Sequence, residues 1–216
     1  MLNFYRALRL LGLDVDVVPP GYSLVGYKLV AAPTLPVVGG GALESFRNAE
    51  GVVVFGPRSG SKTAEFHIPS GLPPGSLREL VPVRVLGAEG VEKELVKWDE
   101  RRYPVSIWRE YLEGEGEPFA YFGDGAAAAY RQGRYFYLGF WPPVEFLLDL
   151  FEKLANEVRI PTVRLPDNVR LRSRDRFRFA FNYSRRTQKV PAPHGVQFIL
   201  GSRELPPCGV AIWEER

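Results

Sequence analysis

The residues whose types could most readily carry out chemistry lie in the stretch VVVFGPRSGSKTAEFHIP, residues 52–69. The apolar run 52–55 predicts a buried strand, and the segment 56–63 differs by one residue from the GxxxxGK[ST] pattern that binds nucleotide phosphates. Ser61 stands where that pattern needs its second glycine. Five Pro or Gly residues between 69 and 75 leave little room for the helix whose N-terminus would face the phosphates. The spacing therefore argues against a nucleotide site.

Nucleophilic hydrolysis has suitable residue types here but no diagnostic spacing. A serine of this loop, His67 and Asp124 could supply a nucleophile, a base and an orienting carboxylate. The chain has no GxSxG motif, and its only cysteine, Cys208, lies far from any predicted strand-to-helix turn. We therefore predict no catalytic residue. The polar residues of the loop instead form a predicted interaction surface: Arg58, Ser59, Ser61, Lys62 and His67.

Metal binding and glycoside hydrolysis find equally little support. The two histidines, His67 and His194, are 127 positions apart, and no HxH, HxxxH or CxxC spacing occurs. We predict neither a metal nor a cofactor. Four glutamates fall between positions 110 and 117, where Gly114 and Gly116 favour a solvated loop over the paired carboxylates of a glycosidase.

Composition places the chain among soluble globular proteins. Its 216 residues are 45% hydrophobic, enough for one substantial core, and no apolar run approaches the roughly 18 residues of a membrane span. With a single cysteine and no signal-peptide pattern, we expect a cytoplasmic protein. Of the 28 basic residues 22 are Arg, which is typical of thermophilic sources.

The basic residues are concentrated near the end of the chain. Residues 166–216 hold ten Arg or Lys against five Asp or Glu. Arginines at 170, 172, 174, 176 and 178 alternate with apolar residues, and we expect the aromatic residues of this segment on the opposite, buried side of a strand. Because an RNA-binding sheet exposes its aromatics beside its basic residues, we predict ion pairing here and no nucleic-acid partner.

Hydrophobic periodicity predicts an α/β domain over residues 1–165. Tyr5, Leu8 and Leu11 mark one face of a helix that ends at Gly12. Three apolar runs predict parallel strands at 15–18, 28–32 and 52–55, with a crossover helix at 42–49. Weaker strand patterns follow at 81–85 and 91–97, and a clearer one at 119–122. The expected fold is an open, mostly parallel sheet with helices on both faces.

The remaining patterns are a hairpin, a helix and a second domain. Gln132-Gly133 predicts a tight hairpin, and Pro142-Pro143 opens a helix with one apolar stripe: Phe146, Leu147, Leu150, Phe151 and Leu154. Strict alternation over 169–173, 177–183, 196–200 and 210–213 predicts a small antiparallel all-β domain at 166–216.

The order of several segments resembles glycoside hydrolase family 42, the bacterial β-galactosidases. The segments are FYRALRLLGLDVDVVPPGYSLVGYKLVAAPTL, VVVFGPRSGSK, GRYFYLGFW, RFRFAFNYS and LPPCGVAIWE. The first three are similar to the family's trimerisation domain, which has a flavodoxin-like fold related to class I glutamine amidotransferases. The last two are similar to its C-terminal β domain. The resemblance implies a homo-oligomer, a trimer, or a partnership with a separate barrel-containing glycosidase chain.

The same resemblance implies no active site in this chain. The family's catalytic glutamates belong to an N-terminal barrel that the resemblance does not cover. Trp141 occupies the place where amidotransferase-like domains often carry a catalytic histidine. Three functions stay open: a non-catalytic assembly module, part of a split or truncated β-galactosidase with glutamates on another chain, or a sugar-binding module. The last would use tryptophans as stacking platforms: Trp98, Trp108, Trp141 and Trp213.

Overall fold

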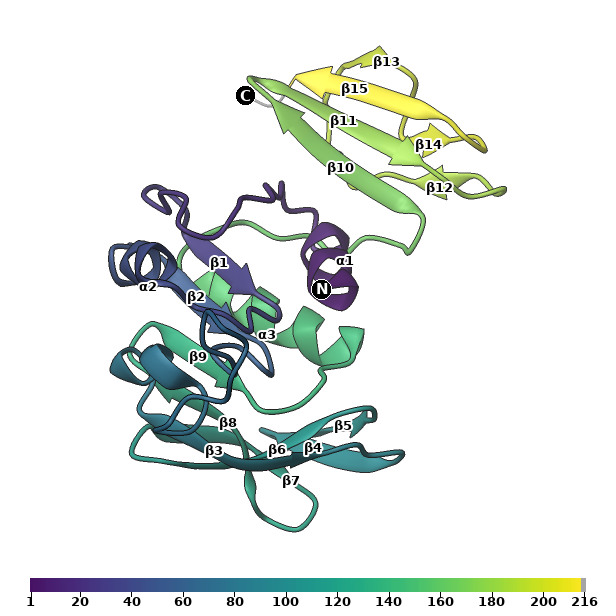
Figure 1. Ribbon diagram of the computed structural model, residues 1–216. Coiled ribbons are helices and arrows are strands. Elements are labelled where there is room, and N and C mark those ends of the chain that lie inside the picture. The colour runs from purple at the N-terminus through teal and green to yellow at the C-terminus, as the bar shows by residue number, and fades with distance from the viewer. Residues whose placement is uncertain (215–216) are drawn as a thin grey trace. The chain divides into compact units, whose positions relative to one another are not determined.

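The computed structural model describes residues 1–214 (Figure 1). The chain divides into two compact units. The first, here the α/β unit, is residues 18–147 together with residues 1 and 3. The second, here the β unit, combines residues 2 and 4–17 with the chain from 148 onward. The N-terminal helix thus belongs to the same unit as the C-terminal strands.

A seven-stranded mixed sheet forms the centre of the α/β unit. Its strands, in spatial order, are β1 (Leu29–Ala32), β2 (Val52–Phe55), β9 (Tyr135–Leu138), β8 (Ala127–Gln132), β7 (Glu117–Phe122), β4 (Glu94–Trp98) and β5 (Arg101–Val105). Only the β1–β2 and β2–β9 pairs are parallel, whereas the other four pairs are antiparallel. The prediction of a mostly parallel sheet was therefore wrong, because the middle of the chain returns through hairpins instead of crossover helices.

Residues 15–18 do not form the predicted strand. Val17 is 82% exposed, and Asp14 accepts hydrogen bonds from the backbone N–H of Ser173 in the β unit. The two aspartates that alternate with the valines, and the two prolines that follow, keep this segment at the surface. A short apolar run was mistaken for a buried strand.

One helix and a separate two-stranded ribbon share a core with β2. The helix α2 (Gly40–Arg47) is the predicted crossover between β1 and β2, and its Phe46 packs edge-on against Phe55, with ring centroids 4.9 Å apart. The ribbon pairs β3 (Val83–Glu89) with β6 (Arg109–Gly114). A 3₁₀ turn, η1 (Gly75–Glu79), precedes β3. Side chains of all these elements, with Tyr137 of β9, form one hydrophobic cluster.

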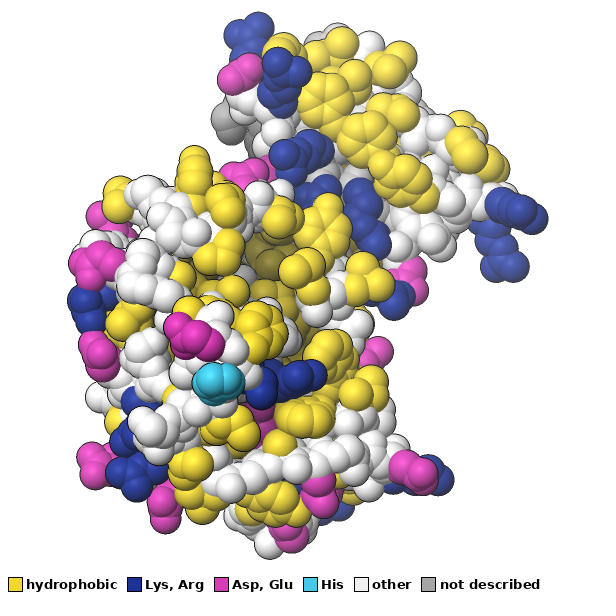
Figure 2. All heavy atoms as spheres, viewed as in Figure 1, with side chains coloured by type: hydrophobic (Ala, Val, Ile, Leu, Met, Phe, Trp, Pro, Cys, Tyr) yellow, Lys and Arg dark blue, Asp and Glu magenta, His cyan; other side chains and the backbone are white. Residues whose placement is uncertain are grey.

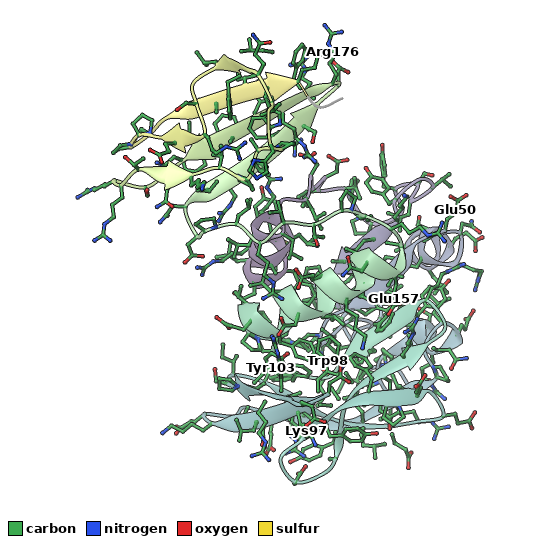
Figure 3. All side chains as sticks on the ribbon, turned by 180° about the vertical axis from the view of Figure 1, so that it is seen from behind. Glu50, Lys97, Trp98, Tyr103, Glu157 and Arg176 are labelled. Carbon is green, nitrogen blue, oxygen red and sulfur yellow. The ribbon has the colours of Figure 1, made fainter. Side chains whose placement is uncertain are left out.

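The helix α3 (Val144–Glu157) begins after Pro142-Pro143, as predicted. All five residues of its predicted apolar stripe are buried. Phe146 lies against Trp98 and Tyr103, at centroid distances of 5.3 and 5.1 Å. Figure 3 shows Trp98 pointing toward this helix, whereas its neighbour Lys97 points away from it. None of the helices in residues 1–214 has the length and apolar character needed to cross a membrane.

The helix α1 (Leu2–Leu10) opens the β unit. Gly12, the predicted stop, follows in the turn after Leu10 with φ +72°, but Tyr5 is 44% exposed and does not belong to the buried face. Phe4 packs against Phe151 instead, with ring centroids 5.9 Å apart. The buried Arg9 donates a hydrogen bond of 2.6 Å to the carbonyl of Leu171, which ties the helix to the sheet of this unit.

The sheet of the β unit is antiparallel. Its order is β10 (Val169–Arg174), β11 (Phe177–Asn182), β15 (Val210–Glu214) and β13 (Phe198–Leu200), and β12 (Gln188–Lys189) pairs separately with β14 (Glu204–Leu205). The inner face of the sheet carries Leu171, Ala180 and Trp213, which pack with Val190 and Leu205 into a second hydrophobic cluster. This confirms an α/β part followed by a β part.

The arginines of this sheet lie differently from the prediction. Residues 170, 172 and 174 are register partners of Phe181, Phe179 and Phe177, so they share the outer face with the aromatics. Arg178 lies on the inner face and donates to Ser173 Oγ at 2.5 Å. The expectation that the aromatics occupy the opposite, buried face was wrong, because the two rows come from neighbouring strands joined by a two-residue turn.

Candidate functional site

The loop after β2 is fastened to the segment that follows β1. The backbone N–H of Gly60 donates to the carbonyl of Leu35 at 2.8 Å, and that of Lys62 donates to the carbonyl of Pro36 at 2.9 Å. Both segments lie at the carboxyl ends of their strands. The next helical turn is η1, which begins at Gly75. These two amides are occupied and no helix starts in the loop, so it does not have the geometry of a phosphate loop.

Arg58 has a left-handed backbone with φ +66°. Its N–H donates a 2.8 Å hydrogen bond to Glu110 Oε1, and its guanidinium carbon lies 5.2 Å from the ring centroid of Trp108. A non-glycine residue in this region carries strain, which persists only where the surroundings hold it. Glu110 therefore fixes the backbone that directs the exposed Arg58 side chain onto the indole.

Glu110 is the most deeply buried carboxylate of the site, at 2% exposure. Oε1 also accepts a 3.1 Å hydrogen bond from Trp108 Nε1, and Oε2 accepts one of 2.9 Å from the hydroxyl of Tyr137. Burial raises the pKa of Glu110 above its ordinary value, although these donors and the Arg58 N–H act in the opposite direction. Burial and the neighbouring carboxylate raise the pKa of Tyr137 as well, so it stays a neutral donor.

One residue in each of the two loops, Ile107 and Phe66, is exposed and has a strained backbone. Ile107 has φ +81°, and the N–H of Trp108 donates to the carbonyl of Ser106 at 3.0 Å, which makes a classic γ-turn with Ile107 at its tip. Phe66 has φ +64°. Ile107 is 61% exposed and Phe66 is 68% exposed. Side chains of this size rarely tolerate left-handed backbone, and each is displayed to solvent.

We call the group formed by the two loops the edge surface. It comprises Arg58, Lys62, Phe66, His67, Ile107 and Trp108. The residues come from the loop after β2 and from the turn that enters β6. A hydrogen bond of 2.6 Å from Glu110 N–H to the carbonyl of Gly139 holds that turn against the end of β9. In Figure 2, basic and hydrophobic side chains lie next to one another on the visible face of the α/β unit.

The structure separates the five predicted loop residues into two groups. Arg58 and His67 are exposed and Lys62 is half-buried, so all three can contact a partner. Ser59 is fully buried and accepts a 3.3 Å hydrogen bond from the N–H of Leu35. Ser61 is half-buried, and its Oγ has no partner among the described residues. Only Ser59 therefore has a side-chain hydrogen bond that supports the loop.

Glu110, Trp108 and Tyr137 were missed as parts of this site. The segment around Glu110 was expected to be a solvated loop, but it is strand β6, and its first two residues are buried. The apolar and aromatic residues at positions 107 and 108, directly before Arg109-Glu110, were a signal for burial of this carboxylate. The link from Glu110 to Arg58 spans 52 positions, which no local pattern reveals.

Asp124, considered above as a triad member, pairs with an arginine. Arg109 is 4% exposed and donates to Asp124 at 2.5 Å and to Glu94 at 2.9 Å. Its guanidinium carbon also lies 4.1 Å from the Phe122 ring centroid. The N–H of Ala126 and then Arg109 lower the pKa of Asp124. This cluster joins β6 to β4 and to the turn after β7 through ion pairs.

Two of the four tryptophans that were considered as sugar-stacking platforms are buried. Trp98 is 6% exposed and Trp213 is 1% exposed, so neither ring can receive a ligand. Trp108 is half-buried and has Arg58 over its ring. Trp141 is half-buried, and its N–H donates to the carbonyl of Trp108 at 3.1 Å. None of the four tryptophans therefore presents an exposed ring face on which a sugar could stack.

Comparison with known proteins explains this architecture. Residues 1–161 match the family model of the β-galactosidase trimerisation domain, and residues 168–215 match that of the β-galactosidase C-terminal domain. The chain belongs to glycoside hydrolase family 42. It is 49% identical over 215 residues to a β-galactosidase of Thermus thermophilus and to β-galactosidase BgaA of a Thermus species. These thermophilic relatives agree with the arginine-rich composition.

Solved structures of this family share the fold. The β-galactosidase of the psychrophilic Marinomonas ef1 matches 100% of this chain with a TM-score of 0.95 and 31% identity. That of the haloarchaeon Halorubrum lacusprofundi matches 98% with a TM-score of 0.87 and 29% identity. The chain spans about a third of the length of these family 42 relatives: 33% of each Thermus protein and 33% of the Marinomonas chain. That third is the non-catalytic trimerisation and C-terminal domains.

Proposed function

We propose that this chain is an assembly part of a β-galactosidase and that it holds copies together, as a trimer, through its edge surface. The observation that carries the proposal is the match of residues 1–161 to the trimerisation-domain family. The strained and exposed side chains of the edge surface support its location. Arg58, Phe66 and Ile107 are each held in left-handed backbone, and such strain gathers at contact sites.

The chemistry of the edge surface suits contact with protein. Arg and Trp are enriched among the residues that contribute most to interfaces, and here Arg58 covers the face of Trp108. Phe66 and Ile107 add exposed apolar area. Glu110 holds the Arg58–Trp108 pair in one geometry before contact, which lowers the entropic cost of association.

Charge reversal at Arg58 tests the proposal. Arg58→Glu places a carboxylate beside Trp108 and should dissociate the oligomer, with a dissociation constant at least about tenfold higher. Arg102→Glu is the matched control, because Arg102 is an exposed arginine on β5, the outer strand of the sheet farthest from β1. Sedimentation velocity of wild type and both variants gives the result. Equal association of Arg58→Glu and wild type would remove the edge surface from the interface.

A second candidate is a chain that completes a β-galactosidase encoded in two parts. The match to two non-catalytic domain families supports it. The carboxylates for hydrolysis would then come from the other polypeptide. Addition of this chain to a barrel-only glycosidase should raise hydrolysis of a chromogenic β-galactoside. Hydrolysis by this chain alone would contradict both candidates.

Three finer assignments belong to the same proposal. We place the domain boundary at 165/166, supported by family matches that end at 161 and begin again at 168. A flavodoxin-like relationship of the α/β unit is supported by its parallel β1–α2–β2 crossover. A cytoplasmic location is supported by the single cysteine, Cys208, which is free and exposed.

A further inference from the structure

The outer face of the β-unit sheet carries a row of aromatic rings. Phe177, Phe179 and Phe181 alternate along β11, and Tyr183 follows them. The rings of Phe179 and Phe181 are nearly parallel, with centroids 6.5 Å apart, and those of Phe181 and Tyr183 are 6.2 Å apart. Tyr183 is 67% exposed. The row is therefore an ordered apolar strip along the length of one strand.

Aliphatic residues widen this strip across two more strands. The register places Ile212 of β15 beside Phe179, and Val210 beside Phe181. Leu200 of β13 is the partner of Ile212 and is 52% exposed. Figure 2 shows hydrophobic side chains as a continuous area over β11 and β15. An antiparallel sheet with one face in a core normally turns polar residues to the other face, so an apolar outer face marks a contact site.

A basic border runs along one side of the strip. Arg170, Arg172 and Arg174 of β10 lie beside the three phenylalanines in the register. No ion pair or hydrogen bond of the Arg174 side chain is present within residues 1–214. Arg176, which extends from the end of the unit in Figure 3, has its guanidinium carbon 5.2 Å from the Phe177 ring centroid. The face therefore complements an apolar surface edged with carboxylates.

We propose that this outer face docks a folded protein domain whose apolar surface is bordered by carboxylates, supplied by the part of the family 42 polypeptide that this chain does not match. About two thirds of each Thermus relative's length lies outside the match, so a large folded body accompanies this β unit in them. A second copy is a poor occupant, because arginine rows of two copies would repel each other. The aliphatic residues and Glu214 at the same face favour protein over nucleic acid.

The probe for this proposal is the first two thirds of the Thermus thermophilus β-galactosidase, expressed alone and checked for folding by circular dichroism. The full chain is titrated into it by calorimetry. Phe179→Ser and Arg174→Glu should each raise the dissociation constant at least about tenfold. Leu86→Ser and Arg102→Glu are matched controls on exposed strand positions of the other unit and should change nothing. Equal binding by all four variants, or no binding by wild type, would overturn the proposal.

A hybrid enzyme gives a second measurement that does not need an isolated probe. The last third of the Thermus thermophilus protein is replaced by this sequence. Phe179→Ser should then lower the Tm of the hybrid by about 2–4 °C more than it lowers the Tm of this chain alone. Equal shifts would mean that the face contacts nothing in the hybrid and would contradict docking.

The same variants distinguish domain docking from other ligands of the outer face and from the proposed oligomer. If Phe179→Ser dissociated an oligomer of this chain, or abolished binding of a labelled oligouridine, the docking proposal would be replaced by a second copy or by nucleic acid. Arg58→Glu should dissociate the oligomer while leaving the titration with the Thermus fragment unchanged. Failure of either proposal can thus be recognised without the other.

Discussion

Glu110 organises the site at the scale of single residues. It accepts hydrogen bonds from three donors: the Arg58 N–H, the Trp108 indole and the Tyr137 hydroxyl. Through the first it holds the left-handed backbone of the loop after β2, and through the second it fixes the ring that Arg58 covers. A single buried carboxylate therefore positions two residues of the edge surface without contacting a partner itself.

Removal of this carboxylate should lower the free energy of unfolding strongly, whereas replacement by its isosteric amide should lower it little. Glu110→Ala removes the acceptor of three donors, of which the Tyr137 hydroxyl is buried, and we expect a loss of about 3–5 kcal/mol in the free energy of unfolding. Glu110→Gln keeps an acceptor oxygen for Arg58 and Trp108, and its amide can donate to Tyr137. Urea unfolding of the three proteins measures the difference. Equal losses in both variants would show that hydrogen bonding does not define this site.

The raised pKa of Glu110 makes a prediction about pH. Because the carboxyl holds its proton more tightly in the folded state, its contribution to stability is fully present below the unfolded pKa and is lost as pH rises through the folded value. Wild type should therefore lose stability relative to Glu110→Gln as pH rises above the ordinary glutamate pKa of about 4.3. Urea unfolding at increasing pH checks the sign. A gain with rising pH would contradict the burial effect.

Gly60 is required by a close approach of two loops. It has φ +65°, and a Cβ atom built on it would lie 1.9 Å from the carbonyl oxygen of Pro74. Gly60→Ala should lower the free energy of unfolding by about 3 kcal/mol or more. Gly133→Ala is the control, because Gly133 also has positive φ but has no atom within 4 Å of its Cβ position. It should cost about 1 kcal/mol. Thermal unfolding compares the two, and similar losses would contradict the steric account.

At the scale of elements, α3 anchors its first turn to the antiparallel part of the sheet. Phe146 is fully buried, and its ring lies 4.9 Å from that of Phe140 as well as against Trp98 and Tyr103. The apolar stripe of this helix was predicted from sequence because its spacing of three and four residues depends on nothing else in the chain.

Phe146→Ala should therefore destabilise the chain by about 3–5 kcal/mol, since the cavity cannot refill. The emission of Trp98 should shift to longer wavelength as water reaches the ring. Leu95→Ala on β4 is the control, because Leu95 is 45% exposed, and it should change stability by less than about 0.5 kcal/mol. Chemical unfolding followed by tryptophan fluorescence gives both readouts. A loss below about 1 kcal/mol at Phe146 would contradict this anchoring role.

Local elements could be predicted from the sequence, whereas their partners could not. The hairpin after β8, the helix α3 and the alternation of β10 and β11 follow from turn chemistry and periodicity. The direction of the sheet was mistaken because the middle of the chain adds antiparallel strands through hairpins such as β4–β5 and β7–β8, where the strand patterns do not reveal the pairing partner. The face shared by the arginines and phenylalanines likewise depends on the register between two strands.

At the scale of the whole molecule, the chain combines two compact units, for each of which we propose a different contact surface. The α/β unit presents the edge surface, with its strained Arg58, Phe66 and Ile107. The β unit presents an aromatic strip bordered by arginines. No pattern of catalytic residues was predicted, and the buried Glu110 serves a positioning role. The two surfaces suit a part whose task is to bring other polypeptides into a fixed arrangement.

Assembly through the α/β unit is the central claim, and the mass of the purified chain in solution tests it most directly. Light scattering coupled to size-exclusion chromatography measures that mass over a range of loading concentrations. The account predicts three times the chain mass of 24.3 kDa for wild type. A mass of 24.3 kDa at every concentration would contradict it.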